Sequence, residues 1–210
     1  MMSLRIAAVV AAMAVALWAA GKKNVSLRPG DVVIEYTSAT SGMAGAIIAA
    51  SAQGESVAPC HVGILSVDSA GCPVVVEASP RHGVTATPLG RFLASADSIG
   101  DRPAVRIMRV DDADGALAAA RAMTHIGEPY DWMFAVDNGA MYCSELVQVA
   151  YGTDIFPYLK LNFLDASGAM PEYWARLYER LGCEAPQGQP GTSPRQQAMN
   201  PRLHLVYSYF

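Results

Sequence analysis

Short apolar runs separated by turn residues dominate the first half of the chain and predict a β-rich segment. The most strand-like part is a hairpin, His61–Val67 and Pro73–Ala78, joined by a turn over residues 68–71. In chain order, we expect a strand at 30–36, a helix of small residues at 40–50, the hairpin, and strands at 83–87 and 104–110.

The second half of the chain changes to helical spacing. Asp111 and Asp112 are predicted to cap a helix that runs to about Ile126, where Gly127 stops it. A further helix begins near Cys143. Its apolar positions, i, i+3, i+4, i+7 and i+8, form one face and are occupied by Cys143, Leu146, Val147, Ala150 and Tyr151. The first residue of that helix therefore faces the core or a cleft.

The last third is predicted to hold a helix from Pro171 to about Leu181, a long loop over residues 184–201 and a final strand at 203–207. Together these elements predict an α+β fold, with one mainly antiparallel sheet flanked by helices. With 210 residues, 52% of them hydrophobic, we expect residues 22–210 to form a single domain. The net charge of −4 argues against a nucleic-acid partner.

Residues 1–21 have the layout of a secretory signal. A basic Arg5 precedes the apolar run 6–20, and small residues surround a cleavage position after Gly21. We expect export to the periplasm or cell envelope. The alternative is an uncleaved anchor, through which residues 6–20 would associate with a membrane.

Four cysteines, Cys60, Cys72, Cys143 and Cys183, are too few and too irregularly spaced for a disulfide framework. If one is a nucleophile, at most one pair of the others can bridge, and the sequence does not show which pair. Neither a Cys-x-x-Cys nor a His-Glu-x-x-His motif occurs, so we expect no metal and no other cofactor.

Cys143 has the features of a nucleophile, because the positive end of a helix dipole stabilises a thiolate. A thiolate that attacks an amide also needs a general acid for the leaving nitrogen, and histidine suits that role. His61 is preferred over His82, His125 and His204, since it is expected to begin a rigid strand.

Glu77 stands within an apolar strand, where an unpaired carboxylate would be costly. If the hairpin register places His61 and Glu77 on one face, opposite or diagonal, the carboxylate can orient the imidazole. The alternative partners for Glu77 are Arg81 and Arg106.

Several segments resemble the YiiX/YebB/YaeF group of permuted papain-like amidases, relatives of the NlpC-type peptidases. They are His61–Ile64, Val76–Ala78, Gly127–Phe134 and Tyr142–Val147. The resemblance extends from about Pro29 to the C-terminus, and the order His, Glu, Cys is what a circular permutation of the papain-like fold would produce. It implies a nucleophile at Cys143, a general acid/base at His61 and an orienting residue at Glu77. Cys60 departs from the pattern, because a Ser-like residue is expected there.

The resemblance implies a cysteine hydrolase that cleaves an amide through a thioester, with a cell-wall peptide, another peptide or a related amide as substrate, and the N-terminal layout implies that it is exported. Two alternatives remain open: a thiol acyltransferase or lipid amidase of the same fold, and a catalytically silent binding module of the envelope. Tyr142 and Tyr36 are weak candidates for a second oxyanion donor beside the Cys143 N–H. Glu145 is expected to be structural, and Tyr130, Asp131 and Trp132 to pack beneath the Cys143 helix.

Overall fold

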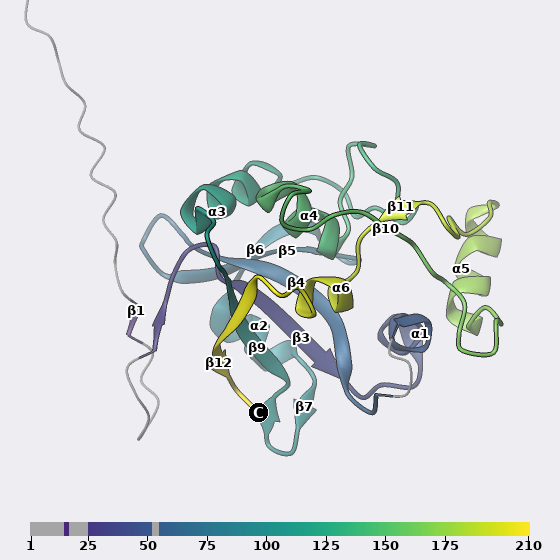
Figure 1. Ribbon diagram of the computed structural model, residues 1–210, viewed down its shortest axis with the longest axis horizontal. Coiled ribbons are helices and arrows are strands. Elements are labelled where there is room, and N and C mark those ends of the chain that lie inside the picture. The colour runs from purple at the N-terminus through teal and green to yellow at the C-terminus, as the bar shows by residue number, and fades with distance from the viewer. Residues whose placement is uncertain (1–14, 17–24, 52–54) are drawn as a thin grey trace, which may run out of the picture.

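The centre of the structure, a computed structural model that describes residues 15–16, 25–51 and 55–210, is a six-stranded sheet (Figure 1). All its neighbouring strands are antiparallel, in the order β12-β9-β3-β4-β5-β6. The strands are β3 (Val32–Thr37), β4 (Ala58–Val67), β5 (Pro73–Ser79), β6 (Gly83–Pro88), β9 (Val105–Val110) and β12 (Leu203–Ser208). The predicted antiparallel sheet with flanking helices is confirmed.

Three short ribbons supplement the sheet. They are β1 (Val15–Ala16) with β2 (Ser26–Leu27), β7 (Ser98–Ile99) with β8 (Arg102–Pro103), and β10 (Leu159–Lys160) with β11 (Pro190–Gly191). Apart from the two residues of β1, the signal segment expected over residues 1–21 lies outside the described residues. Within the part of the chain that is described, no helix has the length and apolar character needed to cross a membrane.

Helices cover both faces of the sheet, with α3 and α4 on one face and α2 on the other (Figure 1). The first face is the larger core, to which α4 contributes Leu146 and Val147 and the sheet contributes Ile34 and Ile64. The second is smaller and holds Phe92 of α2. The helices are α1 (Gly42–Ser51), α2 (Leu89–Ser95), α3 (Gly115–Thr124), α4 (Cys143–Tyr151), α5 (Glu172–Leu181) and α6 (Pro194–Ala198).

The predicted start of α3 is two to three residues too early. Asp114, and not Asp111 or Asp112, is the N-cap, and its side chain accepts a hydrogen bond from the Leu117 N–H at 3.0 Å. Asp112 has a positive φ of 53°, a left-handed conformation that belongs to the preceding turn. The helix can therefore begin only after this turn is complete.

The segment expected to be a loop, residues 184–201, contains β11 and α6. Ser193 caps α6 by accepting a hydrogen bond from the Gln196 N–H, and Pro194 follows at the first helical position. A helix of five residues is too short to show a hydrophobic period, which is why the composition of the segment suggested a loop. The short α2 was missed for the same reason.

The loop after α3 is held against the edge of the sheet by β6. Gly83, at the start of β6, has φ +64°, and a Cβ there would lie 2.2 Å from the carbonyl oxygen of Glu128. The next residue, Val84, donates its N–H to the same oxygen at 2.9 Å. Only glycine permits this approach, which brings the following aromatic segment toward the start of α4.

Candidate active site

His61 lies inside β4, because this strand begins at Ala58 and not at His61 as expected. In β3, Glu35 pairs with His61 and the next residue, Tyr36, pairs with Pro59. Cys60 is therefore the additional residue of a β-bulge. The Cys60 thiol donates to the Glu35 carbonyl at 3.6 Å, and burial raises the pKa of this thiol. The unexpected cysteine is thus directed at the neighbouring strand and leaves the imidazole free.

His61 and Glu77 are in direct contact: His61 Nε2 and Glu77 Oε2 are 2.6 Å apart. Strands β4 and β5 pair from Ile64–Val76 to Val67–Pro73, and the same register continued places Glu77 diagonal to His61. The expected sharing of one face is confirmed, and the alternative partners Arg81 and Arg106 are wrong. Both side chains are largely enclosed, with 18% of His61 and 11% of Glu77 exposed.

Thr87 holds the second oxygen of the same carboxylate. Its Oγ1 donates to Glu77 Oε1 at 2.6 Å from β6. Burial acts to raise the pKa of Glu77, but hydrogen bonds from His61 and Thr87 outweigh it, so the pKa lies below its usual value. Sequence reasoning missed Thr87. Strand alternation could have identified it only after the β5–β6 register, which pairs Val75 with Thr87, was known.

Cys143 is the first residue of α4 and is 6% exposed. The expected apolar face is confirmed, since Leu146, Val147 and Ala150 are fully buried beneath it. Because Cys143 is the first helical residue, no carbonyl of an earlier helical turn can accept a hydrogen bond from its backbone N–H. The helix therefore presents a thiol and an N–H donor at its positive end.

The Cys143 side chain lies beside the imidazole of His61. Burial of the ring acts to lower the pKa of His61. Hydrogen bonding to Cys143 and Glu77, together with their negative charges, overcomes this and raises it well above its ordinary value. On its other side the ring stacks on Phe92 of α2, with centroids 6.0 Å apart. Because Glu77 contacts Nε2, Nδ1 is the ring nitrogen left for Cys143.

Several contacts fix the start of α4. Glu145 accepts a hydrogen bond from the Tyr142 N–H at 3.3 Å, consistent with its expected structural role. Gln197 of α6 donates to the Ser144 carbonyl at 2.6 Å. The Tyr142 hydroxyl accepts from the Thr192 N–H at 3.0 Å. The segment that was expected to be a loop thus anchors the helix that carries Cys143.

The aromatic segment before α4 is a packing element, as expected. Tyr130 is buried with its ring 5.0 Å from Trp132, and Phe134 lies 4.9 Å from the ring of Tyr142. Asp131 is buried and accepts backbone N–H groups from Met133 and Ala135. This closed loop supports the N-terminal end of α4 from one side.

The remaining histidines and cysteines form no hydrogen bond with His61, Glu77 or Cys143 among the described residues, although the charge of His82 contributes to the lowered pKa of Glu77. His125 Nδ1 contacts Glu128 at 2.9 Å, and His204 Nδ1 contacts Asp111 at 2.6 Å on the surface. All four cysteines are free thiols, with Cys72 and Cys183 exposed. Within residues 15–16, 25–51 and 55–210, no group of three or more His, Cys, Asp or Glu side chains could hold a metal ion.

Comparisons with known proteins agree with this geometry. Residues 26–207 match the model of the C92 peptidase family, described as permuted papain-like amidase enzymes of the YaeF/YiiX type. The uncharacterized protein YiiX of Escherichia coli K12 is 31% identical over 157 residues, which cover 70% of this chain and 72% of that protein.

A solved structure is also similar. The crystal structure titled metalloprotein YiiX, from Escherichia coli O157:H7, superposes with a TM-score of 0.65 at 27% identity and covers 86% of this chain and 96% of that one. The described residues of the present chain offer no donor set that fits such a metal.

Proposed function

Since the chain belongs to the permuted papain-like amidases, a family of cysteine amidases and peptidases, we propose that Cys143, His61 and Glu77 catalyse hydrolysis of a peptide amide. One observation carries the proposal. Glu77 holds the His61 ring at 2.6 Å through Nε2, while the Cys143 side chain interacts with the same ring. The raised pKa of His61 favours an imidazolium, and its positive charge stabilises the neighbouring thiolate.

In the first half-reaction, the Cys143 thiolate attacks the carbonyl carbon and forms a C–S bond. The His61 imidazolium transfers the proton of Nδ1 to the amide nitrogen, the C–N bond breaks, and the amine leaves. The product on the protein is a thioester at Cys143, and His61 is neutral. Glu77 accepts from Nε2–H throughout and keeps the ring in position.

In the second half-reaction, neutral His61 takes a proton from a water molecule, which attacks the thioester carbonyl. The C–S bond breaks, the carboxylic acid product leaves, and the thiolate and imidazolium are restored. The Cys143 N–H donates to the developing oxyanion in both steps. The Tyr142 hydroxyl accepts a hydrogen bond from the Thr192 N–H and keeps its own hydrogen to donate, so Tyr142 stays a candidate for the second donor. Tyr36 contacts the ring of Phe210 edge to face, and the guanidinium of Arg106 lies over the Tyr36 ring.

The substrate that we propose is a peptide of the cell wall or envelope, met after export directed by residues 1–21. Residues 22–210 would then form the mature domain. Nothing in the described site favours a lipid over a peptide. No observation in the described residues therefore supports the acyltransferase or the silent binding module over the hydrolase.

The proposed activation is tested by the pH dependence of iodoacetamide alkylation, followed for each cysteine by mass spectrometry. Exposed Cys72 and Cys183 act as ordinary thiols within the same molecule. We expect Cys143 to react well below pH 8.5, the range of an unperturbed thiol, and His61→Ala to shift its profile toward that range. His204→Ala, a surface histidine, is the matched control and leaves the profile unchanged.

Hydrolysis is tested with a mixture of short peptides analysed by mass spectrometry. Cys143→Ser is expected to abolish cleavage, and His61→Ala to slow it by at least about a hundredfold. If Cys143 reacts like Cys72 in both wild type and His61→Ala, the nucleophile assignment is wrong. The silent binding module would then be the better interpretation.

A further inference from the structure

A groove of about 390 Å³ runs between α1 and α5, which lie side by side at one end of the molecule (Figure 1). It is open to solvent and is separate from the His61–Glu77 pair. Its lining comes almost entirely from the two helices and the residues that precede them.

The α1 side of the groove is built from residues with minimal side chains. Gly42, Gly45, Ala46 and Ala49 line it, preceded by the hydroxyl-bearing Thr40 and Ser41. A Cβ at Gly45 would lie 2.6 Å from the Thr40 carbonyl carbon, so a larger residue there would force the turn outward. The small residues keep the space open.

The α5 side carries the functional groups. Tyr173, Arg176 and Arg180 line the groove and follow one another at helical spacings of three and four residues, so they share one face of α5. Arg180 lies close enough to Tyr173 for its charge to act on the phenol. Two guanidinium groups and a phenol therefore face the same space.

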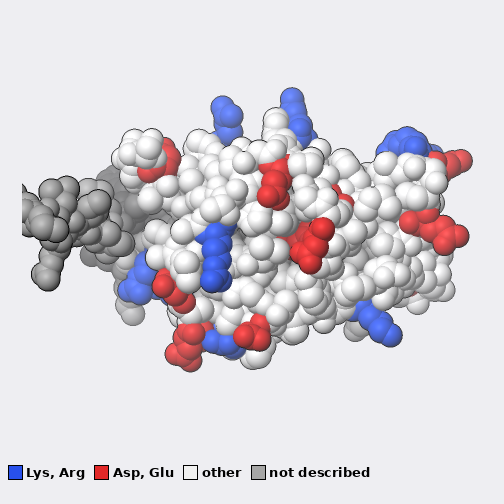
Figure 2. Space-filling view, turned by 90° about the horizontal axis from the view of Figure 1, so that it is seen from above, with Lys and Arg blue, Asp and Glu red and all other residues white. Residues whose placement is uncertain are grey.

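The charge of this groove is opposite to that of the chain. Glu172 pairs with Arg176, but both side chains are highly exposed, so this pair is weak and easily exchanged. Among the ion pairs of the described residues, none involves Arg180. Basic and acidic side chains are seen together at this end of the molecule (Figure 2). The lining retains an excess positive charge in a chain of net charge −4.

Tyr130 connects the wall of the groove with the proposed nucleophile. Tyr130 is buried, and Cys143 and Tyr173 both lie near enough for their charges to act on its phenol. Cys143 does not line the groove itself. A peptide with its amide at Cys143 would therefore reach the groove only by extending past Tyr130 and Tyr173.

We propose that the groove between α1 and α5 binds a carboxylate of the peptide substrate through Arg176 and Arg180. The two planar guanidinium groups can form paired hydrogen bonds with a carboxylate, which a point charge cannot do. This inference rests on the proposed role of Cys143 as nucleophile and adds the chemical class of the substrate. The amide to be cleaved would belong to a peptide with an acidic end.

The test uses iodoacetyl-glycyl peptides of increasing length, each made with a free C-terminal carboxylate and with a C-terminal carboxamide. Cys143 displaces iodide and forms a thioether, and mass spectrometry gives the labelling rate. At one or more lengths, we expect the carboxylate probe to label wild type about three- to tenfold faster than its carboxamide partner. The net negative charge of the whole chain would by itself make the carboxamide probe react faster than the carboxylate probe.

The decisive variant is Arg176→Gln/Arg180→Gln, in which the carboxylate preference is expected to disappear. Arg28→Gln/Arg102→Gln removes the same charge from two exposed arginines outside the groove and is expected to keep the preference. Thermal unfolding and the iodoacetamide rate of Cys143 show whether each variant is folded with its thiol intact.

Equal rates for the two probes at every length, or a preference that survives in Arg176→Gln/Arg180→Gln, would overturn the groove assignment. A failure of the proposed function is distinguished from this result. If the proposed function is wrong, Cys143 would react with iodoacetamide at the same rate as Cys72, and His61→Ala would not change that rate.

Discussion

Among the described residues, two carboxylates are buried in ion pairs, and their surroundings differ. Glu77 contacts the imidazole of His61 at 2.6 Å and the hydroxyl of Thr87 at 2.6 Å. Asp31, at the start of β3, contacts both Arg109 Nε at 2.7 Å and Arg109 Nη2 at 2.9 Å. Asp31 is 1% exposed and Glu77 is 11% exposed.

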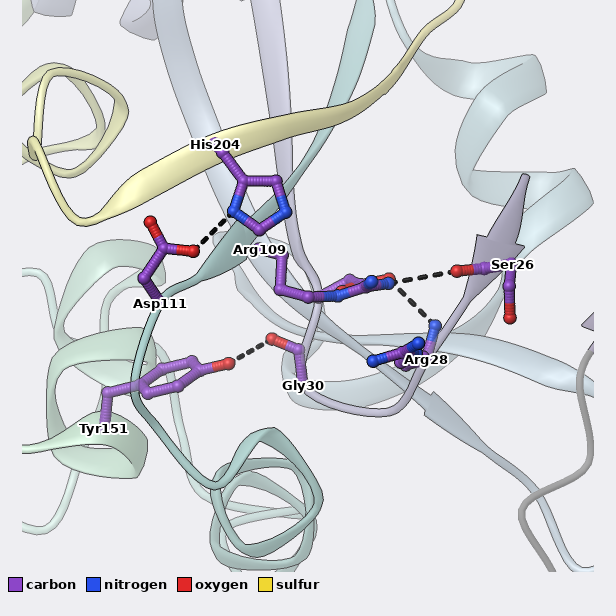
Figure 3. A network of polar contacts seen from close by, with 8 residues as sticks. Ser26, Arg28, Gly30, Arg109, Asp111, Tyr151 and His204 are labelled. Atoms are coloured by element: carbon purple, nitrogen blue, oxygen red, sulfur yellow. Dashed lines mark hydrogen bonds and ion pairs between the residues drawn. The ribbon is translucent and has the colours of Figure 1, made fainter. Parts of the chain in front are cut away.

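The surroundings of Asp31 form a closed network (Figure 3). The Arg28 N–H donates to Asp31, and Arg109 also donates to the Ser26 carbonyl. Tyr151 of α4 donates to the Gly30 carbonyl beside them. Hydrogen bonding to Asp31 raises the pKa of Arg109 further, so this partner is always charged.

The difference lies in the partner and not in the carboxylate. Arg109 cannot lose its proton, and its contacts join β2, β3 and β9, so the Asp31 pair holds elements together. His61 can exchange a proton and keeps one ring nitrogen for Cys143, so the Glu77 pair can take part in chemistry. A buried ion pair is therefore a functional indicator only when its partner can titrate.

The largest expected effects come from neutralising each carboxylate in turn. Asp31→Asn should lower the free energy of unfolding by about 2 kcal/mol, because Arg109 loses its buried partner, and leave Cys143 alkylation per folded molecule unchanged. Glu77→Gln should slow Cys143 alkylation at pH 6 about tenfold and change stability by less than about 1 kcal/mol. Urea denaturation and alkylation rates measure the two effects. If Asp31→Asn instead slowed alkylation, and Glu77→Gln instead lowered the free energy of unfolding, the comparison would be wrong.

A smaller effect is expected at Thr87, which positions Glu77 and touches no substrate in the proposed mechanism. Thr87→Val removes the hydroxyl and keeps the shape, so alkylation of Cys143 should slow about threefold, with its pH profile moved toward that of Glu77→Gln. Thr87→Ser retains the hydroxyl and should behave like wild type. A purely structural role would lower stability without moving the pH profile.

A further effect depends on pH and concerns Glu145, a carboxyl without a charged partner. Burial raises the pKa of Glu145 to about 8, and the Tyr142 N–H and nearby Asp131 modify it. The folded state therefore holds a proton that the unfolded chain releases near pH 4.5, so stability contributed by Glu145 is lost as the pH rises from about 5 to about 8. Relative to Glu145→Gln, wild type should lose stability steadily over this interval in urea titrations. A constant difference between the two proteins would contradict it.

Residue patterns along the chain were enough to predict most of the sheet and the helix that carries Cys143. The strand-like apolar runs over residues 61–67 and 73–78 and the apolar face from Cys143 to Tyr151 are both present in the structure. The start of α3 was not predicted, because several acidic residues in succession can each cap a helix and only the turn geometry at Asp112 selects Asp114.

Taken alone, the sequence determined the residue types and the local periods: a cysteine at the start of an amphipathic helix, a histidine and a glutamate in strands of one hairpin, and an order matching a permuted family. Tertiary structure alone decided the contacts between them. The bulge at Cys60 sets the direction of His61, Thr87 arrives from a third strand, and Gln197 fixes the start of α4 from residues distant in sequence. The physical reason is that a side-chain period depends on neighbours along the chain, whereas register, bulges and close approach depend on packing between strands and helices.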